Sequence, residues 1–334
     1  MNIMLTSVGR RAYMVKYFKN VVGEEGQIHV CNSDDQTVAF HYADHCVISP
    51  LIYDEAYIPF LVNYCREHKI DLLMSLFDID LLVLAKNKDV FAQVGTKVVV
   101  SDPEIVEVCN DKWKTYLFLK EHGFRVPKTY LSLEQVLMAL DSGEIQYPVI
   151  VKPRFGCGSI AMAVADDEMA LLYHFRKGNR TITRSYLQYE SAGVEEKLLY
   201  QECLNGQEYG VDVINDLEGN HRAVIVKKKI AMRAGETDIA QICDMPEIHA
   251  EATRLGNLTG HIANMDCDVF MVDGKPYVLE MNARFGGGYP FSHMGGCNLP
   301  QAIVKWAKGE PVGDEAFQVQ TGITGYKELY ITQK

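Results

Sequence analysis

The sequence lacks several features that would place it in a special class of protein. No apolar run approaches the ~18 residues that a membrane-spanning helix requires. No internal repeat or low-complexity segment occurs, and the first residues, MNIMLTSVGRR, are too short and too polar for a signal peptide. With 48% hydrophobic and 23% charged residues in a chain of 334, we expect a folded cytoplasmic protein with a sizeable core.

Basic residues and paired cysteines are also scarce. Lys and Arg number 33 against 44 Asp and Glu, a net charge of −11. Binding to nucleic acid is therefore not expected, because it requires a basic surface. The nine cysteines are scattered and form no Cys-x-x-Cys pair, which argues against a disulfide framework or a zinc ribbon. A local basic cleft for a small anionic ligand stays compatible with this composition.

The first third of the chain alternates strand and helix patterns. The expected strands are residues 3–7, 27–32, 70–76 and 97–101, and the expected helices are 12–18, 55–68 and 79–91. This order predicts a doubly wound parallel sheet. Ligands of such sheets lie beyond the carboxyl ends of the strands. The polar residues and the glycine at these ends are Gly9, Arg10, Arg11, Asp34 and Asp78.

The remainder of the chain changes character. A helix is expected at 112–121, and residues 123–127 are typical of a helix stop and linker. Beyond residue 147 strand patterns predominate. Residues 269–272 and 277–281 are predicted to form a hairpin around an Asp-Gly turn.

The strongest candidate site is LEMNARFGGG, residues 279–288. Glu280 and Asn282 are two apart on an expected strand, so both face one side, and Asp268 on the preceding strand can reach the same face. These oxygen ligands suit Mg²⁺ bridging nucleotide phosphates, and Arg284 could face a transferring phosphoryl group. The alternative is a polar strand end whose carboxylates are only solvated. The glycines at 286–288, which let backbone approach a ligand, favour the site.

A second candidate is VIVKPRFGCGS, residues 149–159. Lys152 ends an apolar strand, and Gly156 and Gly158 follow in the turn. A lysine on a strand beside a glycine loop suits a phosphate group, and an unpaired lysine is costly to bury. The motif is neither a Walker P-loop nor a dinucleotide fingerprint, and an ordinary hairpin turn is the alternative.

Two weaker candidates lie between them. In QECLNGQEYGVDV, residues 201–213, Glu202 ends a strand and Glu208 begins the next, so the pair could hold adenine and ribose or merely mark a hairpin. In VKKKIAMRAGET, residues 226–237, alternation puts Lys227 and Lys229 on one face. The three lysines and Arg233 could grip an anion, or they could protect an edge strand.

Together and in this order, the four motifs resemble the ATP-grasp superfamily, particularly its carbamoyl-phosphate-synthetase-like and biotin-carboxylase-like members. The resemblance covers nearly the whole chain. It implies an α/β protein with a doubly wound pre-ATP-grasp domain at 1–110 and an ATP-grasp domain at 111–334. In that domain two α+β subdomains grip ATP, and the mobile lid subdomain spans about 127–200.

The resemblance also implies a role for each matching residue. ATP would be held by Lys112, Lys152, Phe155, Gly156, Gly158, Ser159, Glu202, Cys203, Leu204 and Glu208. Mg²⁺, with Mn²⁺ as an alternative, would be bound by Asp268, Glu280 and Asn282. The catalytic candidates are Arg284, Lys229 and Arg233. The substrate candidates are Gly9, Arg10, Arg11, Asp34, Asp78, Asp212 and Tyr289. Two departures stand out: Asp268 replaces the glutamate of many members, and the loop keeps only two of the family's usual glycines.

The activity that the resemblance implies is ligation. An ATP-dependent ligase would phosphorylate a carboxylate and couple it to an amine, releasing ADP and phosphate. The alternatives are a bicarbonate-activating carboxylase, a carbamoyl-phosphate-synthetase-type subunit, and an ATP-binding module without catalysis. The expected partners are small-molecule substrates, with no nucleic acid and no membrane, and a homodimer is the family's habit.

Overall fold

The computed structural model of the protein describes residues 1–156, 158 and 160–333. Its N-terminal sheet is entirely parallel and has the order β3-β2-β1-β4-β5. These strands are β1 (Asn2–Thr6), β2 (Gln27–Asn32), β3 (His45–Ile48), β4 (Leu72–Ser75) and β5 (Lys97–Val98). The first turn of the chain after β1 therefore lies at the carboxyl edge of the sheet, beside the end of β4.

Helices cover both faces of this sheet because the side chains of its buried strands point alternately to one face and to the other. Ile3 and Leu5 of β1 pack into one apolar cluster and Met4 into another. The helices of this part are α1 (Ala12–Val22), α2 (Tyr57–His68), α3 (Asp78–Ala85) and α4 (Lys88–Ala92), with short 3₁₀ turns at Gly23–Glu25 and Val38–His41. The expected helix at 79–91 is thus two helices, α3 and α4.

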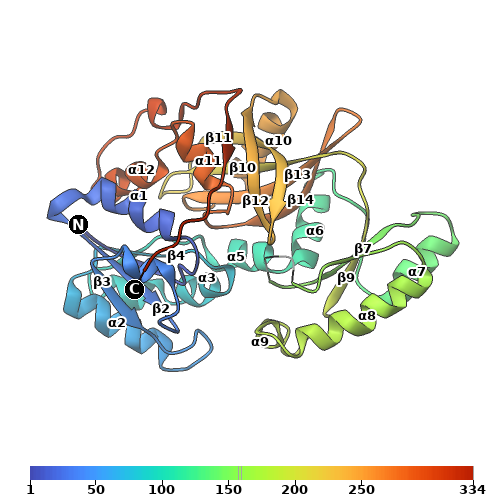
Figure 1. The fold of residues 1–334 in the computed structure, drawn as a ribbon, viewed down its shortest axis with the longest axis horizontal. Helices are drawn as coiled ribbons and strands as arrows, with labels where there is room; N and C mark the ends of the chain where they lie inside the picture. Colours follow the sequence, from blue (N-terminus) through green and yellow to red (C-terminus); the bar gives the residue numbers. More distant parts are fainter. Residues whose placement is uncertain (157, 159, 334) are drawn as a thin grey trace.

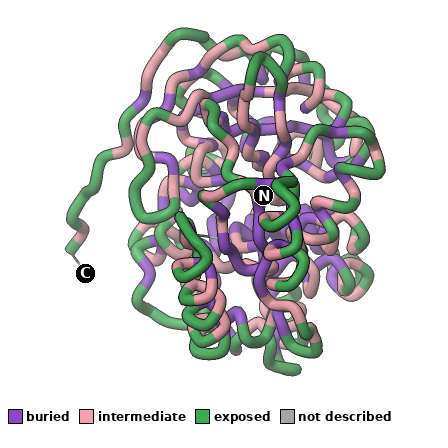
Figure 2. The backbone as a smooth tube through the Cα atoms, turned by 90° about the vertical axis from the view of Figure 1, so that its right-hand side faces the viewer, coloured by how far each residue is buried: buried purple, intermediate pink, exposed green. Residues whose placement is uncertain are grey.

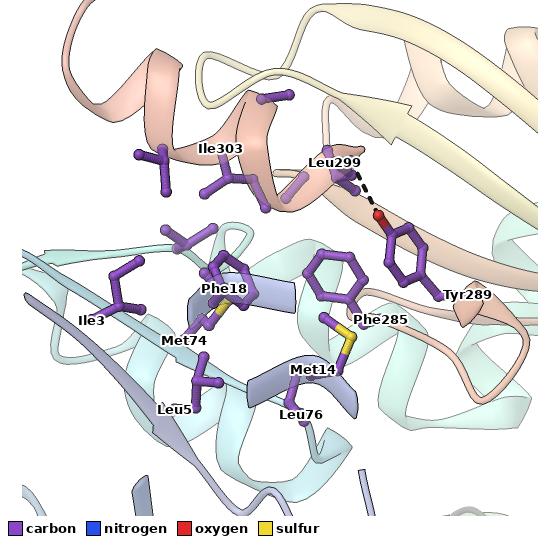
Figure 3. Packing of buried hydrophobic residues seen from close by; sticks show 14 of the residues in the cluster. Ile3, Leu5, Met14, Phe18, Met74, Leu76, Phe285, Tyr289, Leu299 and Ile303 are labelled. Atoms are coloured by element: carbon purple, nitrogen blue, oxygen red, sulfur yellow. Dashed lines mark hydrogen bonds between the residues drawn. The ribbon is translucent and has the colours of Figure 1, made fainter. Parts of the chain in front are cut away.

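The first of these clusters joins the N-terminal sheet to the C-terminal part of the chain. Figure 3 shows Phe18 and Met14 of α1 facing Leu299, Ile303 and Phe285 across one continuous core. The C-terminal helices are α11 (Tyr289–Met294) and α12 (Leu299–Ala307), followed by a 3₁₀ turn at Asp314–Phe317. Shared apolar packing therefore fixes the two parts against each other.

A four-stranded antiparallel sheet forms the middle of the chain, in the order β6-β9-β7-β8. Its strands are β6 (Thr129–Tyr130), β7 (Val149–Pro153), β8 (Ala163–Ala165) and β9 (Leu198–Glu202). Its helices are α7 (Leu133–Asp141), α8 (Glu168–Ile182) and α9 (Leu187–Glu190). This unit has a core of its own, and in Figure 1 it forms the green end of the elongated molecule.

The largest sheet is antiparallel and has the order β14-β13-β10-β11-β12-β15. Its strands are β10 (Gln207–Asn215), β11 (His221–Arg233), β12 (Glu236–Cys243), β13 (Asn264–Val272), β14 (Lys275–Asn282) and β15 (Thr324–Tyr326). One face of this sheet packs against helices α5 (Pro103–Asn110), α6 (Lys112–Glu121) and α10 (Pro246–Thr259). The expected hairpin around Asp273 is confirmed, and both of its strands are longer than the pattern predicted.

Burial follows this layering. In Figure 2 the buried backbone runs through the interior, whereas the C-terminal segment is largely exposed and extends along the outside. That segment adds β15 to the edge of β12 and then crosses to the N-terminal part, where Tyr42 Oη lies 2.9 Å from Thr332 Oγ1. None of the helices in the described part of the chain is long and apolar enough to span a bilayer.

Candidate active site

A cavity of about 760 Å³ opens where the three sheets meet. The N-terminal sheet contributes the β1–α1 turn, the middle sheet contributes β7 and the end of β9, and the largest sheet contributes β10 to β14. Residues far apart in the sequence therefore face one space.

The acidic wall of the cavity is the β13–β14 hairpin. Asp268 and Glu280 are direct cross-strand partners, and Asn282 stands opposite Asp266, so alternation brings all four side chains to one face. Burial raises the pKa of Asp268 to about 7; Lys229 opposes this shift and Glu280 adds to it. Two carboxylates and an amide oxygen form a hard oxygen set that can hold a divalent cation. In the described residues no group of three or more His, Cys, Asp or Glu is placed to hold a metal ion.

Glu280 differs from Asp268 in its balance of charges. Burial raises the pKa of Glu280. The positive charges of Lys112, Lys152, Lys229 and Arg284 outweigh burial and hold this pKa below its ordinary value. Glu280 is therefore kept ionised beside a neighbour whose proton is retained more easily. Such a split between adjacent carboxylates is typical of functional sites.

Of two lysines from the middle of the chain, Lys152 lines the cavity, and Lys112 lies beside it in a small adjoining pocket together with Gly156. Lys152 on β7 is only 6% exposed and donates to Gln201 Oε1 at 3.0 Å. Burial lowers its pKa to about 8. Lys112 begins α6 and donates to the carbonyl of Gly156 in the loop after β7. Asp111 fixes this arrangement, because it caps α6 and binds Arg154 through two contacts of 2.8 and 2.7 Å.

The glycine loop after β7 is shaped by its neighbours. Gly156 has a φ of +89°, and a Cβ there would lie 2.2 Å from Leu187. A Cβ on Gly235, in the turn between β11 and β12, would lie 2.9 Å from the carbonyl of Gly158. The loop is thus enclosed between α9 and the β11–β12 turn. Ser159 lies outside the described residues, and Phe155 stacks near Arg154 rather than lining the cavity.

Arg284 connects the acidic wall to the N-terminal sheet. It donates to Asp266 Oδ2 at 3.1 Å and to Asp78 Oδ2 at 2.9 Å. Asp78 starts α3 at the carboxyl edge of the parallel sheet. A charge pair of this kind holds the guanidinium in one orientation, so Arg284 faces the cavity from a fixed position.

The strand ends around β9 line the opposite side. Glu202, Cys203 and Leu204, the segment that the resemblance assigns to adenine, all line the cavity. Glu202 accepts from the backbone N–H of Lys128 at 2.7 Å. Glu208 accepts from Lys229 at 2.6 Å, and the same ammonium reaches Asp268 at 2.6 Å.

The β1–α1 turn closes the cavity from the N-terminal side. Gly9, Arg10 and Arg11 all line it, as expected for a substrate subsite. Arg11 donates through one nitrogen to the carbonyls of Leu76 at 2.7 Å and Phe285 at 2.9 Å. Arg10 is exposed, which leaves it accessible to an anion entering the cavity.

Besides Lys112, Phe155, Gly156 and Asp78, four more of the expected residues are absent from the cavity lining. Asp34 is exposed in the turn after β2 and accepts from the N–H of Gln36. Arg233 lies near the outer end of β11 and binds Asp238. Asp212 is fully buried behind the cavity and pairs with Lys227.

Tyr289 is the fourth of these residues, and the structure places it in the core. Its hydroxyl accepts from the N–H of Leu299 and donates to the carbonyl of Cys297, each at 3.0 Å. The residue is 0% exposed. The resemblance made it a substrate candidate, but apolar packing turns the ring inward (Figure 3).

Sequence reasoning missed two acidic residues that line the cavity. Asp266 precedes Asp268 by two, and this spacing alone indicates the same face. Glu236 begins β12, a strand that the sequence pattern did not reveal, so no signal pointed to it.

Two family models match the chain. The ATP-grasp domain model matches residues 109–288, and the model of the PylC-like N-terminal domain matches residues 3–99. Among curated proteins, the carbamoyl phosphate synthase large chain of Methanosarcina mazei is 24% identical over 322 residues, covering 90% of this chain and 28% of its own length. That of Methanocorpusculum labreanum is 21% identical over 315 residues, covering 88% and 28%. The chain thus spans little more than a quarter of these relatives.

Solved structures show the same fold. The L-amino acid ligase from Bacillus licheniformis superposes with a TM-score of 0.73 at 19% identity, covering 97% of this chain and 79% of its own. A biotin carboxylase from Campylobacter jejuni, solved with an ATP analogue, gives 0.72 at 18% identity, covering 95% and 73%. These likenesses concern the fold, and the family model covers more than half of the sequence. The chain belongs to the ATP-grasp family.

Proposed function

We propose that the protein is an ATP-dependent ligase that activates a carboxylate as an acyl phosphate and couples it to an amine, releasing ADP and phosphate. One observation carries the proposal. A single cavity brings together Lys152, the oxygen set of Asp268, Glu280 and Asn282, and Arg284, and it also receives the β1–α1 turn. Phosphate-binding groups and a subsite for a second molecule thus share one space.

The residues divide into a nucleotide side and an acceptor side. We assign Lys112, Lys152 and the loop at Gly156 to the phosphates, and the segment 202–204 to adenine. We assign Glu208 to the ribose. These groups lie at strand ends, at the start of α6 or in a turn, where backbone and side chains can approach a ligand.

Asp268, Glu280 and Asn282 would hold Mg²⁺. The donor set fits this ion because it consists only of oxygen atoms from two strands held in register. When bound, Mg²⁺ would neutralise charge on the nucleotide phosphates. Arg284 would add a fixed positive charge beside the γ-phosphate.

The chemistry requires little covalent work from the protein. A carboxylate oxygen attacks the γ-phosphorus, and the bond to the β–γ bridging oxygen breaks to release ADP. The amine nitrogen then attacks the carbonyl carbon, and phosphate leaves with the electron pair of the C–O bond. Positioning and charge neutralisation supply the rate, as in other phosphoryl transfers.

The test is ADP release from Mg·ATP with pooled carboxylic acids, with and without hydroxylamine as a trap for the acyl phosphate. ADP together with a hydroxamate in one acid pool supports the proposal. Glu280→Ala serves as the control for contaminating ATPases and should be silent. AMP and pyrophosphate as products, or no acid-dependent turnover, would refute the ligase.

A bicarbonate-activating reaction is the second candidate, because relatives named carbamoyl phosphate synthase match most of the chain. ATP turnover that depends on bicarbonate and on no organic acid would favour it.

The ligase proposal also includes the organisation of the chain. It treats residues 127–200 as a lid, the division at residue 110 as a domain boundary, and a cytoplasmic homodimer as the working form.

A further inference from the structure

Glu236 occupies the acceptor side of the cavity and has no role in the assignments above. It begins β12 directly after the tight turn at Gly235 and lines the cavity. A Cβ on Gly287 would lie 3.1 Å from its carboxyl carbon. Gly287 follows Arg284 by three residues, so the carboxylate stands close to the segment that carries the phosphoryl-facing arginine.

Two basic residues from distant parts of the chain hold this carboxylate in place. Lys327, just beyond β15, contacts Oε2 at 3.2 Å, and Arg11 Nε lies 3.7 Å from Oε1. Burial alone raises the pKa of Glu236, but Lys327, Arg11 and Arg10 outweigh burial and hold the pKa below its ordinary value. The side chain is therefore ionised at neutral pH although it is only 30% exposed.

The carboxylate keeps unused acceptor capacity. An ionised carboxylate offers about four lone-pair sites, and within the described residues Lys327 supplies its only hydrogen bond. The separation from Arg11 is too long for a hydrogen bond, and Arg11 is itself bound by two backbone carbonyls. By contrast, Asp266 on the same wall is engaged by Arg284.

We propose that Glu236 binds the amino group of the nucleophile and orients it toward the acyl phosphate, so that the second substrate is a primary amine that enters as its ammonium ion. This inference rests on the proposed ligase function. The ammonium donates one N–H to Oε1 of Glu236 and loses a proton to water. The free nitrogen lone pair then forms the C–N bond, the C–O bond to phosphate breaks and phosphate takes that electron pair, and the second proton that the nitrogen must lose goes to the departing phosphate. A charge-assisted hydrogen bond of this kind is strong and directional.

Arg10 complements this assignment. It is exposed at the mouth of the same cavity, beside the β1–α1 turn. A substrate with an anionic group as well as an amine could contact Arg10 and Glu236 together. The subsite therefore favours a nucleophile that carries both charges over a simple alkylamine.

The experiment compares two nucleophiles in one reaction. Four proteins are compared: wild type, Glu236→Gln, Glu236→Asp and Asp238→Asn. Each is incubated with Mg·ATP, an acid that gives a hydroxamate, and hydroxylamine. The competing amine is varied: each of the twenty proteinogenic amino acids, or ammonium chloride, is added in turn. Hydroxylamine is uncharged near neutral pH, so it does not need a carboxylate. Asp238 lies two residues further along β12, binds Arg233, and is absent from the cavity lining, which makes it the matched control.

We expect the amide-to-hydroxamate ratio to fall at least tenfold in Glu236→Gln, through a higher KM for the amine. Glu236→Asp should recover part of the ratio, and Asp238→Asn should keep it. A ratio within twofold of wild type in Glu236→Gln overturns the inference, as does a wild type that forms hydroxamate but no amide. A wild type that forms neither ADP nor hydroxamate instead refutes the proposed ligase itself.

Discussion

Lys227 and Lys229 lie two residues apart on β11 and face the same cavity, yet their surroundings differ. Lys227 is paired with Asp212, and the two side chains are 2% and 0% exposed. Lys229 contacts Glu208 and Asp268, whose side chains are 29% and 20% exposed. The first pair is closed off from solvent, and the second set is open to a ligand.

Gly210 on β10 faces the stems of both lysines. A Cβ at this position would lie 3.4 Å from the stem of Lys229 and 3.8 Å from that of Lys227. The difference between the lysines comes from what covers their partners. Ser292 and Asn264 complete the shell of Asp212 at 2.5 and 3.1 Å. The same residue type on the same strand thus serves architecture in one position and can serve ligand binding in the other.

The largest expected effect comes from breaking the sealed pair. Asp212→Ala leaves the Lys227 ammonium buried without its carboxylate, which costs about 3–5 kcal/mol of stability. Urea unfolding measures this loss. The double variant Asp212→Leu, Lys227→Met removes both charges and should recover most of the stability. A single variant within about 1 kcal/mol of wild type would show that the pair is hydrated rather than sealed.

The open set should respond in activity rather than in stability. Lys229→Met removes the charge that separates Glu208 from Asp268, so we expect kcat/KM for ATP to fall about tenfold to a hundredfold, or about 1.4–2.7 kcal/mol. Acid-dependent ADP release measures it. Lys228→Met is the matched control, because alternation turns that side chain to the other face. Equal losses in both variants would contradict the distinction between the faces.

The sequence pattern predicted part of this arrangement. Alternation placed Lys227 and Lys229 together, and the hairpin placed Asp268 within reach of the face of Glu280, because both inferences need only local geometry; the direct pairing of Asp268 with Glu280 follows a register shift that only the structure shows. The sealing of Asp212 could not be predicted, since its partner Ser292 lies 80 residues away on another element.

The missing predictions have the same cause. The strand β12 escaped notice because its burial alternates only weakly, so Glu236 was not considered. The parallel sheet, by contrast, was predictable because its buried strands are continuous apolar runs. Local periodicity thus gives the elements, and long-range packing decides which polar residues reach the cavity.

A third lysine extends the comparison to pH. Lys152 is buried and has no carboxylate within ion-pair distance in the described residues, and burial lowers its pKa to about 8. Between pH 8 and 10.5 the unfolded state binds more protons than the folded state, so this lysine's cost to stability shrinks as pH rises.

Lys152→Met should therefore be more stable than wild type at pH 7.5, and its advantage should decrease by about 2 kcal/mol at pH 9.5. Urea unfolding of both proteins at the two pH values measures the change. Lys228→Met is a suitable control, since it also replaces one lysine and changes the net charge of the protein by the same amount. A difference that stays constant with pH would mean that Lys152 keeps its charge through an ion pair in solution.

The smallest expected effect concerns the shell around Asp212. Ser292→Ala removes one hydrogen bond to Oδ2 but leaves that oxygen paired with Lys227, so no buried charge is stranded. We expect a loss of about 1–2 kcal/mol, the worth of a hydrogen bond to a charged group, read as a lower urea midpoint with an unchanged slope. A loss as large as that of Asp212→Ala would mean that the serine, not the lysine, neutralises the carboxylate. A small loss instead shows that Asp212 is held by several partners at once.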